Sequence, residues 1–143
     1  MAIRQISVFI ENRRGALADV TGVLAAAGID LRAMSVADTA DYGILRLIVN
    51  DTDKAAKVLL EHGFLSSLTE VLAAEVPDVP GGLFRILDPL GGQDVNMDYL
   101  YAFATGAGRS ASVVLRVRDN ERTEALLRAA GIRMLTEADL AKD

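Results

Sequence analysis

The sequence contains two copies of one pattern, and this repeat constrains the fold more than any other feature. Residues 11–17 match residues 77–83 at an offset of 66, with glycine and leucine at corresponding places. Residues 45–51 match residues 113–119 at an offset of 68, so the second copy is two residues longer in an internal loop. The chain is therefore expected to fold as two similar units.

Within each copy the hydrophobic period changes in a regular order. In the first copy, residues 6–10 alternate between apolar and polar, as in a strand with one buried face. A stripe of apolar residues at helical spacing follows and stops at Gly28. Residues 29–36 and 44–49 then read as two strands, and the turn residues between them predict a hairpin.

A second helix and a fourth strand complete the copy. Asp51 offers an N-cap oxygen before a new helical stripe, Gly63 ends that stripe, and residues 64–69 are extended. The second copy runs the same way to about Leu135, and a short N-capped helix is expected after Thr136.

The order β-α-β-β-α-β is that of the ferredoxin-like arrangement. The predicted class is α+β, with two ferredoxin-like βαββαβ units in tandem, residues 1–69 and 70–143, each an antiparallel sheet with helices on one face. Pro89 is expected to end or kink the first helix of the second copy near Asp88. The sheet face away from the helices is expected to carry a set of large apolar side chains, namely Phe9, Met34, Val36, Ile44 and Ile48.

Composition excludes several classes of function. The 143 residues include no cysteine and one histidine, which removes disulfides, thiol nucleophiles and the usual metal sites, so no catalytic residue, metal or cofactor is predicted. A net charge of −5 without a basic cluster argues against nucleic acid. No apolar run is long enough to cross a membrane and no signal peptide is evident, so a cytoplasmic protein is expected.

The first strand, the loop after it and the second strand carry a resemblance to a known family. Residues 6–17 (ISVFIENRRGAL), followed by residues 28–31, closely resemble the ACT domain, the amino-acid-binding regulatory module of many biosynthetic enzymes. The second copy keeps residues 78–83 and 95–97 of the same motif. The resemblance covers nearly the whole chain twice and implies a tandem ACT protein without an attached catalytic domain.

The resemblance also implies where a ligand binds. In ACT domains it lies at the loop between the first strand and the first helix, usually against a neighbouring ACT unit. Backbone N–H groups at the helix start suit a carboxylate, and side-chain oxygens nearby suit an ammonium group. The corresponding residues are Asn12, Arg14, Gly15, Ala16, Leu17, Asp30 and Leu31 in the first copy and Asp78, Pro80, Gly81, Gly82, Leu83, Asn96 and Met97 in the second.

Each of these residues also has a simpler interpretation. Asn12 and Asp78 can also serve only to turn the chain before the helix, and both interpretations stay open. Arg13 and Arg14 are interpreted as a solvated pair in preference to a carboxylate clamp. His62 is interpreted as a half-buried residue at a helix end in preference to a ligand or a base.

Three functions are compatible with this resemblance. The leading hypothesis is a sensor that binds a small amino acid and transmits its state to a partner, with a homodimer as the expected assembly. The alternative is a regulatory subunit, like the small subunit of acetolactate synthase, that acts through a catalytic partner. An enzyme is the least favoured, because the anion-binding loop of the similarly folded acylphosphatases has no counterpart after Ile10.

Overall fold

A computed structural model of the protein describes residues 2–11, 13–38, 41–104 and 110–141. Its elements are β1 (Ile3–Glu11), α1 (Ala16–Ala26), β2 (Leu31–Asp38), β3 (Tyr42–Val49), α2 (Thr52–Glu61), β4 (Leu65–Pro77), α3 (Gly82–Gly91), β5 (Met97–Ala104), β6 (Ser110–Val117), α4 (Asn120–Ala129), β7 (Arg133–Met134) and α5 (Glu137–Ala141). They follow the order that the repeat predicts.

The chain divides into two compact units. The first unit comprises Arg4–Thr69 and Leu140–Asp143, and the second unit comprises Met1–Ile3 and Glu70–Asp139. The sequence predicts units at residues 1–69 and 70–143. The structure differs only at the two ends of the chain, because Met1–Ile3 belongs to the second unit and Leu140–Asp143 to the first. Strand β4 is continuous and contributes its first residues to one unit and the rest to the other.

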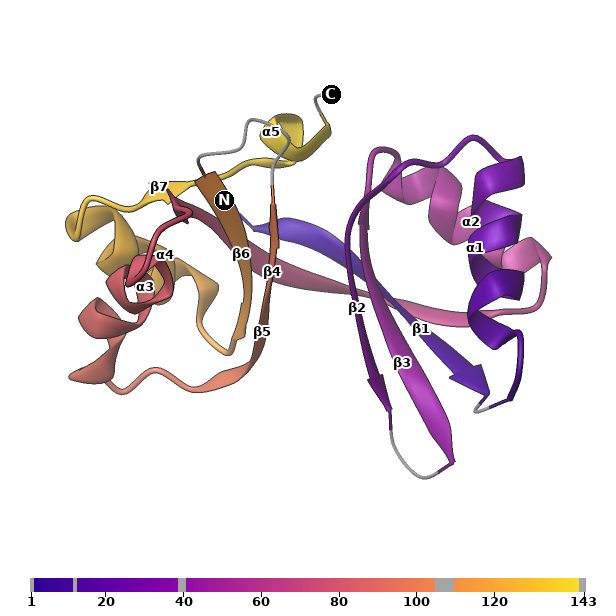
Figure 1. Ribbon diagram of the computed structural model, residues 1–143, viewed down its shortest axis with the longest axis horizontal. Helices are drawn as coiled ribbons and strands as arrows, with labels where there is room; N and C mark the ends of the chain where they lie inside the picture. The colour runs from indigo at the N-terminus through magenta and orange to yellow at the C-terminus, as the bar shows by residue number, and fades with distance from the viewer. Residues whose placement is uncertain (1, 12, 39–40, 105–109, 142–143) are drawn as a thin grey trace. The chain divides into compact units, whose positions relative to one another are not determined.

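The first unit is an antiparallel sheet with two helices on one face. Its strands lie in the order β2-β3-β1-β4, and β3 pairs antiparallel with β1 and β2. Helices α1 and α2 contact each other and cover the same face (Figure 1). The core between helices and sheet contains Ile6, Val8, Leu24, Leu45, Leu47 and Leu59.

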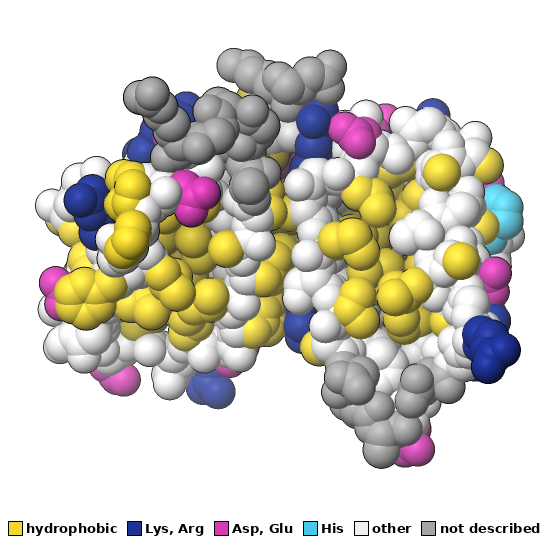
Figure 2. Space-filling view, viewed as in Figure 1, with side chains coloured by type: hydrophobic (Ala, Val, Ile, Leu, Met, Phe, Trp, Pro, Cys, Tyr) yellow, Lys and Arg dark blue, Asp and Glu magenta, His cyan; other side chains and the backbone are white. Residues whose placement is uncertain are grey.

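The second unit repeats this arrangement. Its strands lie in the order β5-β6-β4-β7, with antiparallel pairing throughout. Helices α3 and α4 cover one face, and hydrophobic side chains fill the space between strands and helices in each unit (Figure 2). The second core contains Leu72, Ala74, Ile86, Leu115 and Leu127. The predicted α+β class with two ferredoxin-like units is confirmed.

Corresponding helices begin in corresponding ways. The carboxylate of Asp51 accepts a hydrogen bond from the Lys54 N–H at the start of α2, and that of Asp119 accepts from the Arg122 N–H at the start of α4. Helices α1 and α3 instead begin after Gly15 (φ 82°) and Gly81 (φ 87°), in the left-handed conformation that favours glycine. The predicted Asp51 cap is therefore confirmed.

The C-terminal helix also begins as predicted. The Thr136 N–H donates to the Asp139 carboxylate (2.8 Å), and the Asp139 N–H donates to the Thr136 hydroxyl oxygen (3.2 Å). This reciprocal pair is a capping box, which stabilises the first turn of α5.

Pro89 does not end its helix near Asp88, so that part of the prediction is wrong. Helix α3 continues through Pro89 to Gly91. Proline removes one N–H donor, which would have bonded the carbonyl of residue 85 four positions earlier. Because Pro89 lies in the last turn and Arg85 is exposed, this carbonyl is within reach of water and the helix tolerates the loss.

The predicted apolar face is correct for Phe9, Ile44 and Ile48 but wrong for Met34 and Val36. Met34 pairs with Leu47 and Val36 with Leu45, and these leucines lie in the core beneath the helices. Directly paired residues share a sheet face, so Met34 and Val36 point to the helix side. A register shift between Leu31 and Ala33 causes this, because one extra residue reverses the alternation of the strand.

No helix within the described residues is long and apolar enough to span a membrane.

Candidate functional site

The loop between β1 and α1 is held together by Arg13. Its Nη2 donates to Oδ2 of Asp19 on α1 (2.7 Å), and its Nε lies 3.3 Å from Oε2 of Glu11 at the end of β1. The hydrogen bond and charge of Asp19 raise the already high pKa of Arg13. Arg13 is thus a paired cation that ties the strand end to the helix, and its side chain remains 51% exposed to solvent.

The start of α1 presents backbone donors near this loop. The Ala16 N–H bonds to the Arg13 carbonyl (3.3 Å), which closes a tight turn. The N-cap residue is Gly15, which has no side chain to accept bonds from the N–H groups of the first turn. Such a helix start favours a negatively charged group.

A pocket of about 380 Å³ opens beside this loop within the first unit. Among the described residues, the lining is formed by Phe9, Ile10, Glu11, Arg13, Ala16, His62, Gly63, Phe64 and Leu65. They come from the end of β1, the start of α1, the end of α2 and the start of β4. Small-molecule pockets have volumes of roughly 300–1,000 Å³, so this one suits a ligand of amino-acid size.

The pocket lining combines an apolar wall with charged groups. Phe9, Phe64 and Leu65 contribute apolar surface, and Phe9 also lies 6.1 Å from Tyr42 between ring centroids. Glu11 and Arg13 contribute one charge of each sign. The pocket therefore presents both charged and apolar groups.

His62 lies at the C-cap of α2 and lines the pocket. Its Nδ1 is 2.9 Å from the Val58 carbonyl oxygen. A carbonyl oxygen only accepts hydrogen bonds, so Nδ1 carries the proton and Nε2 is left for another partner. The residue is exposed, not half-buried as the sequence suggested, because it follows the last residue of its helix, in the turn that leads to β4.

The predicted site residues of the first copy are divided between the two ends of the sheet. Ala16 lines the pocket, and Arg14, Gly15 and Leu17 flank it in the chain. Asn12 lies outside the described residues. Asp30 and Leu31 lie at the far end, because Leu31 pairs with Val49 while Glu11 pairs with Tyr42 at the opposite end of β3.

At that far end Asp30 already has partners. Its backbone N–H donates to the Asn50 side-chain oxygen (2.9 Å), and its carboxylate lies 3.2 Å from Nη1 of Arg32. Leu31 packs against the first core. Within one unit, these two residues and the β1–α1 loop do not form a single site.

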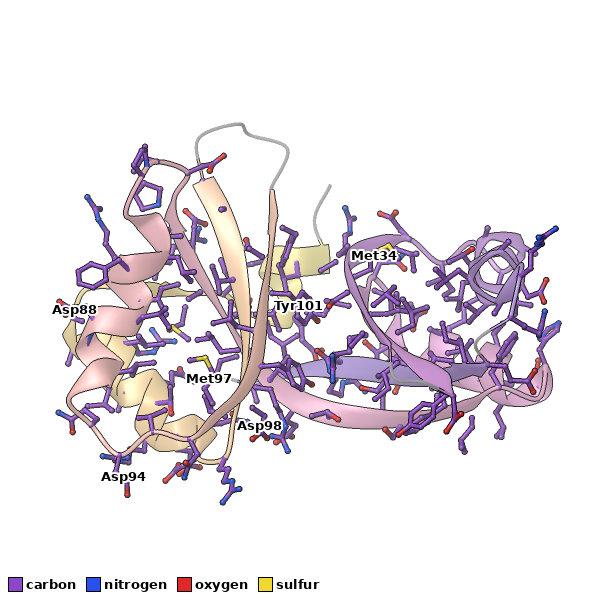
Figure 3. The ribbon with its side chains drawn as sticks, turned by 60° about the horizontal axis from the view of Figure 1, so that its bottom comes forward. Met34, Asp88, Asp94, Met97, Asp98 and Tyr101 are labelled. Atoms are coloured by element: carbon purple, nitrogen blue, oxygen red, sulfur yellow. The ribbon has the colours of Figure 1, made fainter. Side chains whose placement is uncertain are left out.

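The same division holds in the second copy. Asp78, Pro80, Gly81, Gly82 and Leu83 form the loop and helix start after β4, and all but Gly82 are exposed. Asn96 and Met97 lie at the start of β5, where the Asn96 carbonyl accepts from the Arg118 N–H. Met97 packs against the second core from the helix side of β5 (Figure 3).

The second loop is tighter than the first. A Cβ atom on Gly82 would lie 2.4 Å from the Pro77 carbonyl oxygen, so only glycine fits without movement of the backbone. The corresponding residue of the first loop is Ala16, which carries a Cβ and is nearly buried. Gly82 is thus needed for backbone shape.

Sequence reasoning missed most of the pocket. His62, Phe64 and Leu65 are about 50 residues away from the β1–α1 loop in the chain. The available signal was the repeat itself, because His62 and Leu65 stand where the second copy has Ala130 and Arg133. Among the described residues, no group of three or more His, Cys, Asp or Glu side chains could hold a metal ion.

A family model for an ACT domain pair matches residues 1–143. The chain belongs to the ACT family, as a pair of ACT domains. ACT domains are regulatory modules and not catalytic ones. No curated protein matches the sequence of this ACT domain pair.

Solved structures resemble this ACT domain pair over nearly its whole length. Protein BT0572 from Bacteroides thetaiotaomicron is 38% identical, with a TM-score of 0.92 over 100% of this chain and 98% of that one. The ligand-free regulatory subunit of aspartate kinase from Thermus thermophilus is 19% identical, with a TM-score of 0.67 over 90% and 89%. The corresponding subunit from Thermus flavus is 20% identical, with a TM-score of 0.62 over 90% of each chain.

Proposed function

We propose that this ACT domain pair is a regulatory protein that binds a small amino acid at its β1–α1 loop. The pocket beside that loop is the observation that carries the proposal. It combines both signs of charge, from Glu11 and Arg13, with the N-terminus of α1, whose dipole attracts a carboxylate. An amino acid needs these features together, since it presents an ammonium group and a carboxylate on one carbon.

A thermal-shift screen of the purified protein against the twenty amino acids tests this proposal. A ligand at about 100 times its dissociation constant adds roughly 2.7 kcal/mol of stability and raises the unfolding midpoint by several degrees. The shift should shrink in His62→Ala and persist in Lys57→Ala, an exposed change on the same helix outside the pocket. The absence of any selective shift would contradict the proposal.

A regulatory subunit acting through a catalytic partner is the second candidate. Three apolar side chains near the second loop are exposed, Val79 by 51%, Leu83 by 42% and Phe84 by 65%. Such a group is typical of a surface that another protein covers. Isolation of the tagged chain from its native cells should then yield an amino-acid biosynthetic enzyme whose rate changes when the chain is added.

A homodimer is the proposed assembly. Strand β2 is an edge strand of the first sheet, and Met34 and Val36 on it are 46% and 45% exposed. An edge strand with apolar side chains is a ready partner for another strand. Sedimentation at micromolar concentration should give twice the chain mass, and a monomer would contradict this. The cytoplasmic location stays a prediction from the sequence.

A further inference from the structure

The repeat places different side chains at corresponding positions around the two β–α loops. Phe9 and Leu65 line the pocket of the first unit, and they are 40% and 69% exposed. The residues at these positions in the second copy are Glu75 and Arg133, on the paired strands β4 and β7. An exposed apolar pair in one unit thus corresponds to a charged pair in the other.

The charged side chains of the second unit form an ion pair with each other. Arg133 Nη1 lies 2.6 Å from Glu75 Oε2, and the backbone positions of the two residues are direct partners in the sheet. Arg133 Nη2 also lies 3.5 Å from Oδ1 of Asp139. The side chains that correspond to the apolar wall therefore end in charged groups, which offer no apolar surface to an apolar ligand.

At the charged part of the pocket the difference runs the other way: polar residues of the first unit correspond to apolar residues of the second. Arg13 and His62 of the first unit correspond to Val79 and Ala130 of the second. The second loop thus lacks the cation that pairs with Glu11 and the imidazole that leaves one nitrogen available. Each of these four positions has the opposite polarity in the two units.

We propose that the two units divide their roles, with one amino acid per chain bound in the first unit and selected for an apolar side chain. This inference rests on the proposed amino-acid binding and adds which unit binds and what it prefers. The zwitterionic part lies against Glu11, Arg13 and His62, and the side chain lies against the apolar wall. The second unit does not bind the same ligand.

The preference follows from the cost of burying polar groups. A polar or charged ligand side chain against Phe9, Phe64 and Leu65 would lose its bonds to water without new partners. An aliphatic side chain would gain affinity with each buried methylene, by about fourfold. Leucine, isoleucine, valine and phenylalanine should therefore bind more tightly than alanine, and aspartate and lysine should bind least.

Isothermal titration calorimetry on the full chain tests this inference. The wild-type protein should bind leucine with a stoichiometry of one per chain and reject aspartate and lysine. The double variant Phe9→Glu/Leu65→Arg imposes the second unit's charged pair on the first, and it should weaken leucine binding at least tenfold. Both positions are exposed and adjacent strands of the second unit already hold this pair, so the variant should fold.

The matched control makes the opposite exchange in the second unit. Glu75→Phe/Arg133→Leu should leave the dissociation constant of the first site unchanged. Two equal sites per chain, a preference for charged side chains, or unaltered affinity in Phe9→Glu/Leu65→Arg would overturn this inference alone. If none of the twenty amino acids binds the wild-type protein, the proposed function itself is overturned.

Discussion

The two ACT units are alike where the backbone requires it and different where side chains meet solvent. Asp51 and Asp119 cap corresponding helices with bonds of 3.2 and 3.0 Å, and Gly15 and Gly81 adopt nearly the same left-handed conformation. These residues satisfy the geometry of the fold itself. A second copy of the fold can therefore lose or change its surface chemistry without loss of its architecture.

The positions that differ are those around the pocket. Phe9 and Leu65, which are apolar, correspond in the repeat to Glu75 and Arg133, which form an ion pair. A surface ion pair contributes little to stability, so neither arrangement is required for folding. Our proposal assigns this difference to ligand binding, and variants at matched positions can separate an effect on binding from an effect on stability.

The largest expected effect comes from the two cores. Leu24→Ala should destabilise the protein by about 3 kcal/mol and Leu90→Ala by about 2 kcal/mol, because each leaves a cavity. Leu24 is fully buried in α1, whereas Leu90 lies in the last turn of α3 and retains 6% exposure. Urea denaturation measures both, and a larger loss for Leu90→Ala would contradict this ranking.

The next effect distinguishes the two loops. Gly82→Ala should cost about 2 kcal/mol, because the new Cβ would meet the Pro77 carbonyl oxygen and force the backbone to move. Ala16→Gly at the matching position of the first loop should cost no more than about 1 kcal/mol, the usual difference between these residues near a helix. Equal unfolding midpoints for the two variants would show that the loops have the same constraint.

The helix caps should show no difference between the units. Asp51→Ala and Asp119→Ala each remove one carboxylate that accepts a backbone N–H, at a cost of about 1 kcal/mol. Thermal unfolding of the two variants should give similar losses. A large loss of stability in one variant and none in the other would mean that the two caps do not contribute equally to the stability of their units.

The smallest effect is expected at the ion pair. Arg133→Leu should change stability by less than about 0.5 kcal/mol, since the Arg133 side chain is 61% exposed and such pairs gain little in water. Chemical denaturation against wild type checks this. A loss as large as that of a cap variant would assign the Glu75–Arg133 pair a structural role and weaken the argument that it marks a functional difference.

Local patterns account for most of the fold that could be predicted. Alternation and helical spacing located the elements, and Asp51 and the glycines before α1 and α3 marked where helices begin. The errors arose where a single residue had a nonlocal consequence. The register shift near Arg32 turned Met34 and Val36 to the helix side. Helix α3 tolerates Pro89 because this residue lies in its last turn.

The candidate site was predicted less completely. Of the residues predicted to bind a ligand in the first copy, Ala16 lines the pocket, whereas Asp30 and Leu31 lie at the other end of the sheet. Asp30 and Leu31 lie there because β1 and β2 run in the same direction. Helix α1 carries the chain back, so β2 starts at the same end of the sheet as β1. His62 was judged by its helical stripe alone, which says nothing about the turn that brings it beside Glu11 and Arg13.

The sequence by itself determined that this protein is two βαββαβ units, because hydrophobic period and turn chemistry are local properties of the chain, and the resemblance of its loop motif indicated the ACT family. Only the tertiary structure decided which side chains meet. The pocket joins residues near positions 10 and 64 through strand pairing, and the Glu75–Arg133 ion pair forms because β7 lies beside β4. Such contacts depend on register and strand direction, which a linear pattern does not specify.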